Sequence, residues 1–527
     1  MSPAGEPIGL QRLDQLLGQG QLDAAMALVE QALRAGERSL PAHFRLASAC
    51  LRGGRYADAL ALTMRAATLP IAAPGELVEL AKRLMYFNQA PALRTLATGL
   101  LARPLWHAAA EADFAALLSM TGDQELASAL LERAMAAGAC TAAVLYNHSQ
   151  MQLYSGKLEA AERDLQRCLQ LEPAMAKAHW ALSKLPRAAA AEAELQRMRK
   201  LAAQVPPGSQ DEVYLRFALF NRLDQLQHHD QAWSELERGC VAKRGLIDYR
   251  PQVMFALTAA LRAAFPAMPA SVASRSPADS VGAPTPIFIV GMHRSGTTLL
   301  ERILGNHSQV SEGGELYEFP AELRLAIGRH FNGASDIAVV ERLAAIDFAE
   351  LGRRYLRQVA WRAAGRPFLI DKLPSNFLNI GFLRRALPQA RVIHMRRGAM
   401  DTCFSNLKEL FSNACPYSYD QLELADFYGQ YHQLMAHWQQ HAPGYVLEVD
   451  YEQLARDPAG EAERILAFCG LGWEPGCTDL GSNRRAVNTA SSAQVREPIH
   501  QRGIGAWRRY EAQLQPLAAR LAVHGLL

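Results

Sequence analysis

The sequence predicts two fold classes in one chain: an all-α array of helix pairs in the first half and an α/β domain with a parallel sheet in the second. Three observations support this prediction. A short phrase containing glycine or asparagine returns every 34 residues in the first half. In the second half, short β-branched runs alternate with helical patterns. The first of these runs leads into a glycine-bounded loop and a helix start at residues 285–305, a combination that forms a cradle for an anion.

The helix-pair array follows from the recurring phrase, which first appears as GQLDAA at residues 20–25. Glycine or asparagine permits the tight turn between two helices, and the small alanines let the helices approach. The spacing of 34 is the period of the tetratricopeptide repeat. We therefore expect a tetratricopeptide solenoid over residues 1–265, regular to about residue 173 and degenerate after it. The repeated turn residues are Gly20, Gly54, Asn88, Gly122 and Gly156.

The degenerate part of the array and the segment after it set the predicted domain boundaries. Residues 211–226 and 228–240 predict one further helix pair. Residues 266–285, rich in Pro, Ala and Ser, predict a linker, and residues 286–527 predict the second domain. The concave face of such an array suits a polypeptide substrate or a partner protein. Packing on the second domain, or formation of a homodimer, is the alternative use of the repeats.

Composition narrows the class of protein. Of the residues, 50% are hydrophobic and 20% are charged, as in soluble globular proteins. A formal net charge of +3 gives no reason to expect a nucleic-acid partner. The eight cysteines show no metal-binding spacing. The first residues lack the pattern of a secretory leader, and no stretch is apolar enough for a membrane span, so we expect a cytoplasmic protein.

The glycine-bounded loop has the spacing of a nucleotide-binding P-loop. It follows a predicted strand over residues 286–290, and Gly291 and Gly296 bracket four residues. Thr297 stands where the P-loop lysine would contact the β- and γ-phosphates of a nucleoside triphosphate. This replacement argues against an ATPase, a GTPase or a kinase. Arg294 instead places a cation within the loop.

Polar residues follow three further predicted strands, at residues 367–370, 390–395 and 445–449. In parallel sheets, ligands bind beyond the carboxyl ends of the strands. Lys372, one of two lysines after residue 286, would stabilise negative charge that develops there. Arginine suits bidentate recognition of a phosphate. The residues at these strand ends are Lys372, Arg396, Arg397 and Tyr451.

Residues 289–299, IVGMHRSGTTL, resemble the 5′-phosphosulfate loop of sulfotransferases that use 3′-phosphoadenosine-5′-phosphosulfate (PAPS). The similarity is greatest to the tyrosylprotein sulfotransferase branch and to bacterial tetratricopeptide–sulfotransferase proteins, and it covers residues 286–510 in four ordered blocks. It implies a P-loop-type sulfotransferase domain, PAPS as the sulfuryl donor and no metal. The animal enzymes are membrane-anchored in a secretory compartment. This sequence does not reproduce such an anchor, so we expect a bacterial, cytoplasmic enzyme.

The resemblance also implies roles for single residues. Glu315 matches the general base, Lys372 contacts the sulfonate and the departing phosphate, and Arg294 completes the catalytic group. The motif around Arg397 matches the family's 3′-phosphate site, although Gly398 and the following alanine replace the usual Asp-Pro. The final motif is one residue shorter than in the family. The implied donor-binding residues are Arg294, Ser295, Gly296, Thr297, Thr298, Lys372, Arg397, Ser405, Tyr451, Ser491, Arg502 and Gly503.

Several alternatives stay open at the level of sequence. Cytosolic small-molecule sulfotransferases use a histidine base, for which His307 and His394 are candidates. Glu312 and Glu318 flank Glu315, and a solvated acidic helix face is the alternative for all three. We expect a protein tyrosine as the acceptor, with a glycan or small-molecule hydroxyl as the alternative. A repeat scaffold with an inactive transferase domain is a further alternative.

Overall fold

A computed structural model describes the chain except for residues 1–9, 36–38, 186–190, 267–282, 412–413 and 482–498. The described residues form two compact units. The first contains the residues up to Cys140 together with residues 317–332 and 342–347. The second contains residues 141–316, 333–341 and 348–527. The boundary predicted at residues 266–285 rests on sequence character and remains a prediction.

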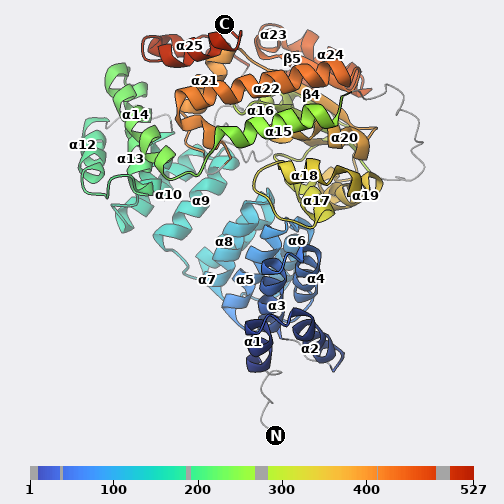
Figure 1. The fold of residues 1–527 in the computed structure, drawn as a ribbon. Helices are drawn as coiled ribbons and strands as arrows, with labels where there is room; N and C mark the ends of the chain where they lie inside the picture. Colours follow the sequence, from blue (N-terminus) through green and yellow to red (C-terminus); the bar gives the residue numbers. More distant parts are fainter. Residues whose placement is uncertain (1–9, 36–38, 186–190, 267–282, 412–413, 482–498) are drawn as a thin grey trace. The chain divides into compact units, whose positions relative to one another are not determined.

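The first unit consists of helix pairs and a short segment from later in the chain (Figure 1). The later segment contributes α17 (Glu318–Ile327) and the 3-10 helix η2 (Leu343–Ala345). The pairs are α1 (Leu10–Gly18) with α2 (Leu22–Arg34), α3 (Leu40–Arg52) with α4 (Tyr56–Ala66), α5 (Pro74–Tyr86) with α6 (Ala90–Leu101), and α7 (Ala108–Ser119) with α8 (Gln124–Ala136).

The backbone at the repeated turns confirms the 34-residue period. A fifth pair, α9 (Ala142–Tyr154) with α10 (Leu158–Leu171), belongs to the second unit. In each of the five pairs the turn residue lies in the left-handed region, where glycine and asparagine are favoured. The φ angles are 73° at Gly20, 73° at Gly54, 54° at Asn88, 85° at Gly122 and 75° at Gly156.

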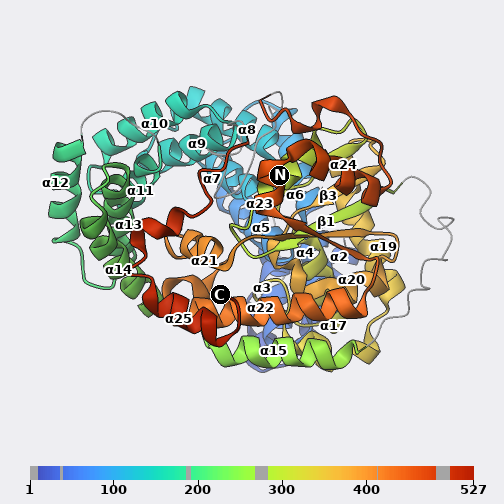
Figure 2. The same ribbon diagram turned by 90° about the horizontal axis from the view of Figure 1, so that it is seen from above.

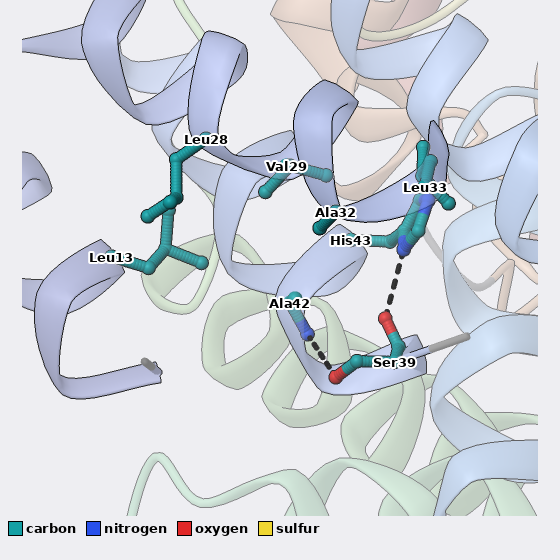
Figure 3. Close-up of a pocket in the computed structure, with 8 residues that line it drawn as sticks. All are labelled: Leu13, Leu28, Val29, Ala32, Leu33, Ser39, Ala42 and His43. Carbon is teal, nitrogen blue, oxygen red and sulfur yellow. Dashed lines mark hydrogen bonds between the residues drawn. The ribbon is translucent and has the colours of Figure 1, made fainter. Parts of the chain in front are cut away.

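An apolar cluster holds the start of the first unit together. It includes the buried side chains of Val29, Leu46 and Leu62, and Leu325 of α17 packs against it. A small apolar pocket lies between α1, α2 and α3 (Figure 3). The polar atoms that line this pocket serve the fold, because the Ser39 hydroxyl accepts from the first turn of α3. The His43 imidazole also lines the pocket, and its Nδ1 lies 2.8 Å from the Ser39 carbonyl.

The second unit begins with the remaining helices of the array. The predicted pair at residues 211–226 and 228–240 is present as α13 and α14, and the left-handed residue between them is Gln227, with a φ of 63°. Helix α15, directly before the predicted linker, was not predicted. The helices after α10 are α11 (Ala176–Ser183), α12 (Ala191–Ala202), α13 (Gln210–Gln225), α14 (His229–Gly245) and α15 (Pro251–Ala264).

The second unit continues with a five-stranded, fully parallel sheet in the order β2-β3-β1-β4-β5, as the predicted fold class requires. The strands are β1 (Thr285–Gly291), β2 (Val310–Glu312), β3 (Phe368–Asp371), β4 (Arg391–Arg396) and β5 (Val446–Asp450). Four of these were predicted within one residue at each end, and β2 was missed.

Helices cover both faces of the sheet. On one face, the apolar residues of β1 and β4 pack with α16 and α24 in a single buried cluster that includes Ile289, Ile303 and Ile465. On the other face, Phe288 of β1 lies against Tyr355 of α19, with ring centroids 5.7 Å apart. The α-helices are α16 (Thr297–Gly305), α18 (Ile337–Glu341), α19 (Phe348–Val359), α20 (Ile380–Ala386), α21 (Ala399–Leu407), α22 (Gln421–His441), α23 (Tyr451–Arg456), α24 (Pro458–Cys469) and α25 (Gln515–Val523).

Short 3-10 helices fill several connections in the sheet domain. One of them, η4, leads directly into α20, so that residues 374–386 form a 3-10 helix followed by an α-helix. Pro374 starts η4, and its tight turns place the buried Asn376 and Asn379 within hydrogen-bonding distance of one another. The 3-10 helices are η3 (Ala360–Ala363), η4 (Pro374–Asn379), η5 (Pro416–Tyr419), η6 (Pro475–Thr478) and η7 (Ala506–Tyr510).

Specific contacts join the later helices of the array to the sheet domain. Figures 1 and 2 both show α15 beside α22, and Thr258 of α15 donates to the Gln430 side chain of α22 over 2.7 Å. Arg244 of α14 donates two hydrogen bonds to Glu423 of α22, over 2.7 and 2.8 Å. Part of the helical array and the sheet therefore fold as one unit.

Two further properties concern the chain as a whole. All eight cysteines are free thiols, and all except Cys140 are buried. None of the helices in the described ranges combines the length and the apolar character needed to cross a bilayer.

Candidate active site

The predicted site residues gather at the carboxyl ends of the five strands. The loop of residues 291–296 follows β1, Lys372 follows β3, Arg397 follows β4 and Tyr451 follows β5. Glu315 lies three residues after β2. Because all five strands are parallel, their carboxyl ends meet along one edge of the sheet, where ligands bind in this class of fold.

The loop after β1 is shaped to hold an anion. Arg294 and Gly296 adopt left-handed conformations, with φ of 67° and 102°, and α16 begins at Thr297. Such loops present concave sets of amide groups, and the helix N-terminus adds positive potential. Ser295 is 1% exposed, and its hydroxyl has no hydrogen-bond partner among the described residues. A buried hydroxyl without a partner fits an anionic oxygen as its acceptor.

Both glycines of the loop are required by close packing. A Cβ at Gly291 would lie 2.5 Å from the carbonyl oxygen of Met395 on β4. A Cβ at Gly296 would lie 2.4 Å from the ring of Tyr451. Tyr451 therefore closes over the start of α16, which places this predicted donor-binding residue against the loop.

The two predicted catalytic residues at the ends of β2 and β3 form an ion pair. The Nζ atom of Lys372 lies 2.7 Å from Oε1 of Glu315. The Lys372 side chain is fully buried, whereas the Glu315 side chain retains 31% exposure. A hydrogen bond from the amide of Lys372 to the carbonyl of Gly314, 2.9 Å long, fixes the two loops to each other. The site thus combines a buried ammonium with a partly exposed carboxylate.

A third residue of this group, Glu301 of α16, was not predicted. It is 4% exposed, and its Oε1 accepts a hydrogen bond of 2.9 Å from the amide of Gly314. Its Oε2 lies 3.8 Å from Nζ of Lys372. Burial raises the pKa of Glu301 to about 7, against the lowering effect of Lys372 and with smaller raising effects of Glu312 and Glu315. A charged residue at a buried position of the apolar helix LLERIL is the signal that sequence reasoning passed over.

Arg397 connects several of the predicted donor-binding residues. Its Nη1 donates to the carbonyl of Arg294 over 3.1 Å, and its Nη2 donates to the carbonyl of Gly503 over 2.5 Å. The guanidinium lies over the ring of Tyr451, 4.8 Å from its centroid. The Nε of Arg397 is buried and has no hydrogen-bond partner in the described part of the chain. Arg397 therefore retains a donor for a ligand such as a phosphate.

Ser405 lies on α21 and faces the loop. Its hydroxyl accepts from Nε of Arg294 over 3.3 Å. The resemblance implies that Ser405 binds the donor together with Arg397, and in the structure its hydroxyl contacts the arginine of the loop. Arg396, by contrast, points to acidic partners on β5 and lies 3.1 Å from Asp450, as expected for a structural arginine.

The final motif is described in part. Ser491 lies outside the described residues. Arg502 is exposed, and the carbonyl of Gly503 accepts from Arg397. Asp401 of α21, which was not predicted, accepts a hydrogen bond of 2.7 Å from the amide of Gly505 and holds this segment beside Arg397.

The two alternative histidine bases, His307 and His394, both have hydrogen-bonding partners within the fold. Nε2 of His307 lies 3.0 Å from the carbonyl of Gly472, and its Nδ1 accepts from the amide of Gln309 over 3.1 Å. His394 is inside β4, with Nε2 2.5 Å from the Tyr431 hydroxyl and Nδ1 3.3 Å from Glu448.

The two glutamates that flank Glu315 are both buried in the fold. Glu312 lies within β2, 3.2 Å from the buried Arg302, and Glu318 is buried at the start of α17. A solvated acidic helix face therefore does not describe these residues.

His293, within the loop, is a further residue that sequence reasoning did not single out. Its Nδ1 lies 3.2 Å from the Tyr417 hydroxyl. Burial lowers the pKa of His293 to about 4, with Glu315 opposing and Lys372 and Arg294 adding to the shift. The imidazole is therefore neutral near pH 7. Within the described ranges, no group of three or more His, Cys, Asp or Glu side chains is placed to hold a metal ion.

Two known proteins align with part of this chain. An uncharacterized protein of Aquifex aeolicus is 34% identical over 239 residues, which are 44% of this chain and 31% of that protein. A Caenorhabditis briggsae protein named "Putative protein-tyrosine sulfotransferase" is 27% identical over 186 residues, 35% of this chain and 65% of that protein. The chain thus spans about a third of the first relative and about two thirds of the second.

A solved structure and two family models complete the comparison. The sulfotransferase domain of the Synechococcus PCC 7002 olefin synthase aligns with a TM-score of 0.32 and 21% identity, covering 45% of this chain and 95% of that domain. Residues 16–68 match the model of the tetratricopeptide repeat, and residues 286–475 match the model of the sulfotransferase family. The chain therefore carries a sulfotransferase-family domain that follows tetratricopeptide repeats.

Proposed function

We propose that this protein transfers the sulfuryl group of PAPS to an acceptor hydroxyl, and that the acceptor is a tyrosine of a polypeptide. One observation carries the proposal: the buried Lys372 lies 2.7 Å from Glu315 at strand ends next to the anion-binding loop. This places a cation that would act on the donor, Lys372, next to a base that would act on the acceptor, Glu315. The matching sulfotransferase-family model supports the reaction class.

Each residue of the pair has a defined task in the proposed reaction. Glu315 takes the proton of the acceptor hydroxyl while the hydroxyl oxygen forms its bond to sulfur. The bond between sulfur and the bridging oxygen of PAPS breaks, and its electron pair stays on the departing adenosine 3′,5′-bisphosphate. Lys372 and Arg294 stabilise the negative charge that develops there. A general base of this kind contributes roughly 10²–10⁴ in rate.

The donor is proposed to extend from the loop towards Arg397. The buried Ser295 hydroxyl and the Nε of Arg397 provide hydrogen-bonding groups at two separate points. Tyr451, Gly503 and the segment around Arg502 border the second point. The roles of Ser405 in 3′-phosphate binding and of Ser491 in contacting the phosphosulfate rest on the resemblance.

A helix of the repeat array lies close enough to the proposed base to interact with it. Tyr154 ends α9, and its pKa is raised by burial and then by the negative charge of Glu315. Lys184, directly after α11, lies 2.7 Å from Glu409, a residue just beyond α21. The position of Tyr154 supports a role of the array in binding the acceptor polypeptide, whereas the Lys184–Glu409 contact fits packing of the array on the sheet domain. The worm relative's name supports a tyrosine acceptor. Dimerisation and a cytoplasmic, bacterial setting remain predictions.

The test is transfer of radioactive sulfate from labelled PAPS into a cell lysate by the full chain, followed by separation into protein, glycan and lipid. We expect label in the protein fraction, on tyrosine, and no label with Glu315→Ala. Glu463→Ala, at an exposed position of α24, is the matched control and should behave like the wild type. Label in the glycan or lipid fraction would contradict the tyrosine acceptor.

A binding measurement separates an inactive scaffold from a wrong donor. Calorimetry with adenosine 3′,5′-bisphosphate and with ATP is expected to show binding of the first ligand. Glu315→Ala should keep this affinity within a factor of about three, because the base does not touch the nucleotide. Binding of the bisphosphate without transfer to any fraction would indicate a scaffold. Absence of binding would contradict the proposed donor.

A further inference from the structure

The buried carboxylate of Glu301 has no role in the reaction described so far. It lies one turn into α16, four residues after the first helical residue, and is 4% exposed. Burying a carboxylate is costly unless hydrogen bonds and an opposite charge compensate for it. The compensation here comes from the amide of Gly314, at 2.9 Å, and from Lys372, at 3.8 Å. Both partners belong to the loops that carry the proposed catalytic pair.

Lys372 therefore stands between two carboxylates. The short contact, 2.7 Å, is with Glu315, and the longer one, 3.8 Å, is with Glu301. The ammonium contacts one of the two oxygens of Glu315, Oε1, whereas its task in the proposed reaction is to stabilise charge on the donor. To turn towards the anionic donor, Lys372 must leave Oε1 and still have a counter-charge. Glu301 is placed to be that counter-charge.

The other charged groups around Glu301 do not take over this task. Glu312 has its own partner, Arg302, at 3.2 Å. Helix α24 and the 3-10 helix η6 pack on α16 through apolar side chains such as Ile465 and Cys477. The groups that act electrostatically on Glu301 are Lys372, Glu312 and Glu315.

We propose that Glu301 is a positioning residue that shares Lys372 with Glu315 and, when ionised, draws the ammonium away from the base. This inference rests on the proposed sulfuryl transfer. Glu301 also has a second positioning contact. Its carboxylate accepts a hydrogen bond from the amide of Gly314, in the loop that leads to Glu315.

The pKa of Glu301, raised to about 7 by burial, supports this role and defines a pH range. Below that range the carboxyl is neutral, and Lys372 has one charged partner, Glu315. Above it the carboxylate is charged, and Lys372 has two. A group with a pKa near 7 changes from about one tenth to about nine tenths ionised between pH 6 and pH 8, so turnover is expected to rise about tenfold over this interval.

The test uses the full chain and the variant Glu301→Gln, which keeps an oxygen for the Gly314 amide but carries no charge. Release of adenosine 3′,5′-bisphosphate from PAPS is followed from pH 6 to pH 8, with the protein fraction of the lysate as acceptor. At pH 8 the variant is expected to turn over about tenfold more slowly than the wild type. The turnover of the variant should not rise between pH 6 and pH 8. Its KM for PAPS should stay within about threefold of the wild-type value.

Two further measurements keep the proposal falsifiable. Glu463→Gln, at an exposed helix position, should reproduce the wild-type pH profile. Infrared difference spectra between pH 6 and pH 8 should show the loss of a protonated carboxyl band in the wild type and not in Glu301→Gln. This readout decides on the protonation of Glu301 even if no sulfuryl transfer is found. The proposal would be overturned if Glu301→Gln showed the wild-type pH profile. It would also be overturned if the variant still showed the wild-type loss of a protonated carboxyl band between pH 6 and pH 8.

Discussion

A fully buried ammonium needs a negative partner, and Lys372 has two carboxylates near it, Glu315 at 2.7 Å and Glu301 at 3.8 Å. The exposure of these partners differs. The Glu315 side chain is 31% exposed, whereas that of Glu301 is 5% exposed. In the proposed reaction the exposed carboxylate faces the acceptor and the buried one holds the lysine. The difference in exposure supports different tasks for these two residues of the same type.

At the residue scale, Glu301→Gln should change the pH dependence of stability. The folded-state pKa of Glu301, about 7, lies above its ordinary value of 4.5. The contribution of this group to stability is therefore full below about pH 4.5 and is lost as the pH rises through about 7. Glutamine does not titrate, so the melting temperature of the variant should rise relative to the wild type from pH 5 to pH 8. A constant difference in thermal melts across this range would contradict the raised pKa.

A second residue-scale prediction concerns Arg397. Its guanidinium touches the Arg294 and Gly503 carbonyls and the Tyr451 ring. Arg397→Ala should weaken binding of adenosine 3′,5′-bisphosphate by about 1.5–3 kcal/mol, the range for a hydrogen bond to a charged group. Calorimetry measures this loss. Arg396→Ala is the neighbouring control, because Arg396 is half-exposed and pairs with Asp450. Unchanged affinity in Arg397→Ala would place the 3′-phosphate elsewhere.

The residues that sequence reasoning found and those it missed differ in one physical respect. Glu315, Lys372 and Arg397 were found because each follows a strand or stands in a motif. Glu301 and Asp401 lie inside helices, where a single acidic residue is usually solvated. Their importance comes from burial and from partners in distant loops, which the local pattern does not show.

At the element scale, the start of α16 depends on Gly296. The residue has a φ of 102°, and an added Cβ would meet the Tyr451 ring at 2.4 Å. Gly296→Ala should cost about 1–3 kcal/mol for the backbone alone. Because Tyr451 must move, affinity for adenosine 3′,5′-bisphosphate should also fall.

Gly472→Ala is the matched control for this element, because a Cβ there would meet nothing within 4 Å. Its unfolding free energy in chemical denaturation and its nucleotide affinity should stay near those of the wild type. If Gly296→Ala and Gly472→Ala behave alike, the close packing of loop, helix and Tyr451 is not what forms the donor site.

The elements that were missed were short or ambiguous. Strand β2 has three residues, Val-Ser-Glu, and its burial on both sides removes the alternation by which an edge strand is recognised. It nevertheless carries Glu315 to the sheet edge. Helix α15 is apolar and directly precedes the predicted linker. Its sequence pattern was therefore not distinguished from that of the degenerate helices of the array.

At the scale of the whole molecule, part of the helical array and the sheet domain form one unit. Arg244 links α14 to α22 through two hydrogen bonds to Glu423, with the two side chains 29% and 20% exposed. Arg244→Ala should therefore lower the free energy of unfolding by about 1.5–3 kcal/mol. Chemical denaturation of the full chain measures this change, with loss of bisphosphate binding as a second probe.

Arg250→Ala is the control for this prediction. Arg250 pairs with Asp248 at side-chain exposures of 72% and 80%, where ion pairs contribute little. The change in its unfolding free energy should stay within about 0.5 kcal/mol. Equal effects of the two substitutions would show that the contact between α14 and α22 does not couple these elements.

The five left-handed turns that recur at the 34-residue period have an evolutionary consequence. Each turn of one repeat can replace the same turn of another, because all share one backbone conformation at positions 34 residues apart. Recombination that duplicates or removes a whole repeat would keep glycine or asparagine at every turn. Events of any other length would place residues other than glycine or asparagine at some turns, where the left-handed backbone is strained. The number of repeats is thus free to drift in whole units.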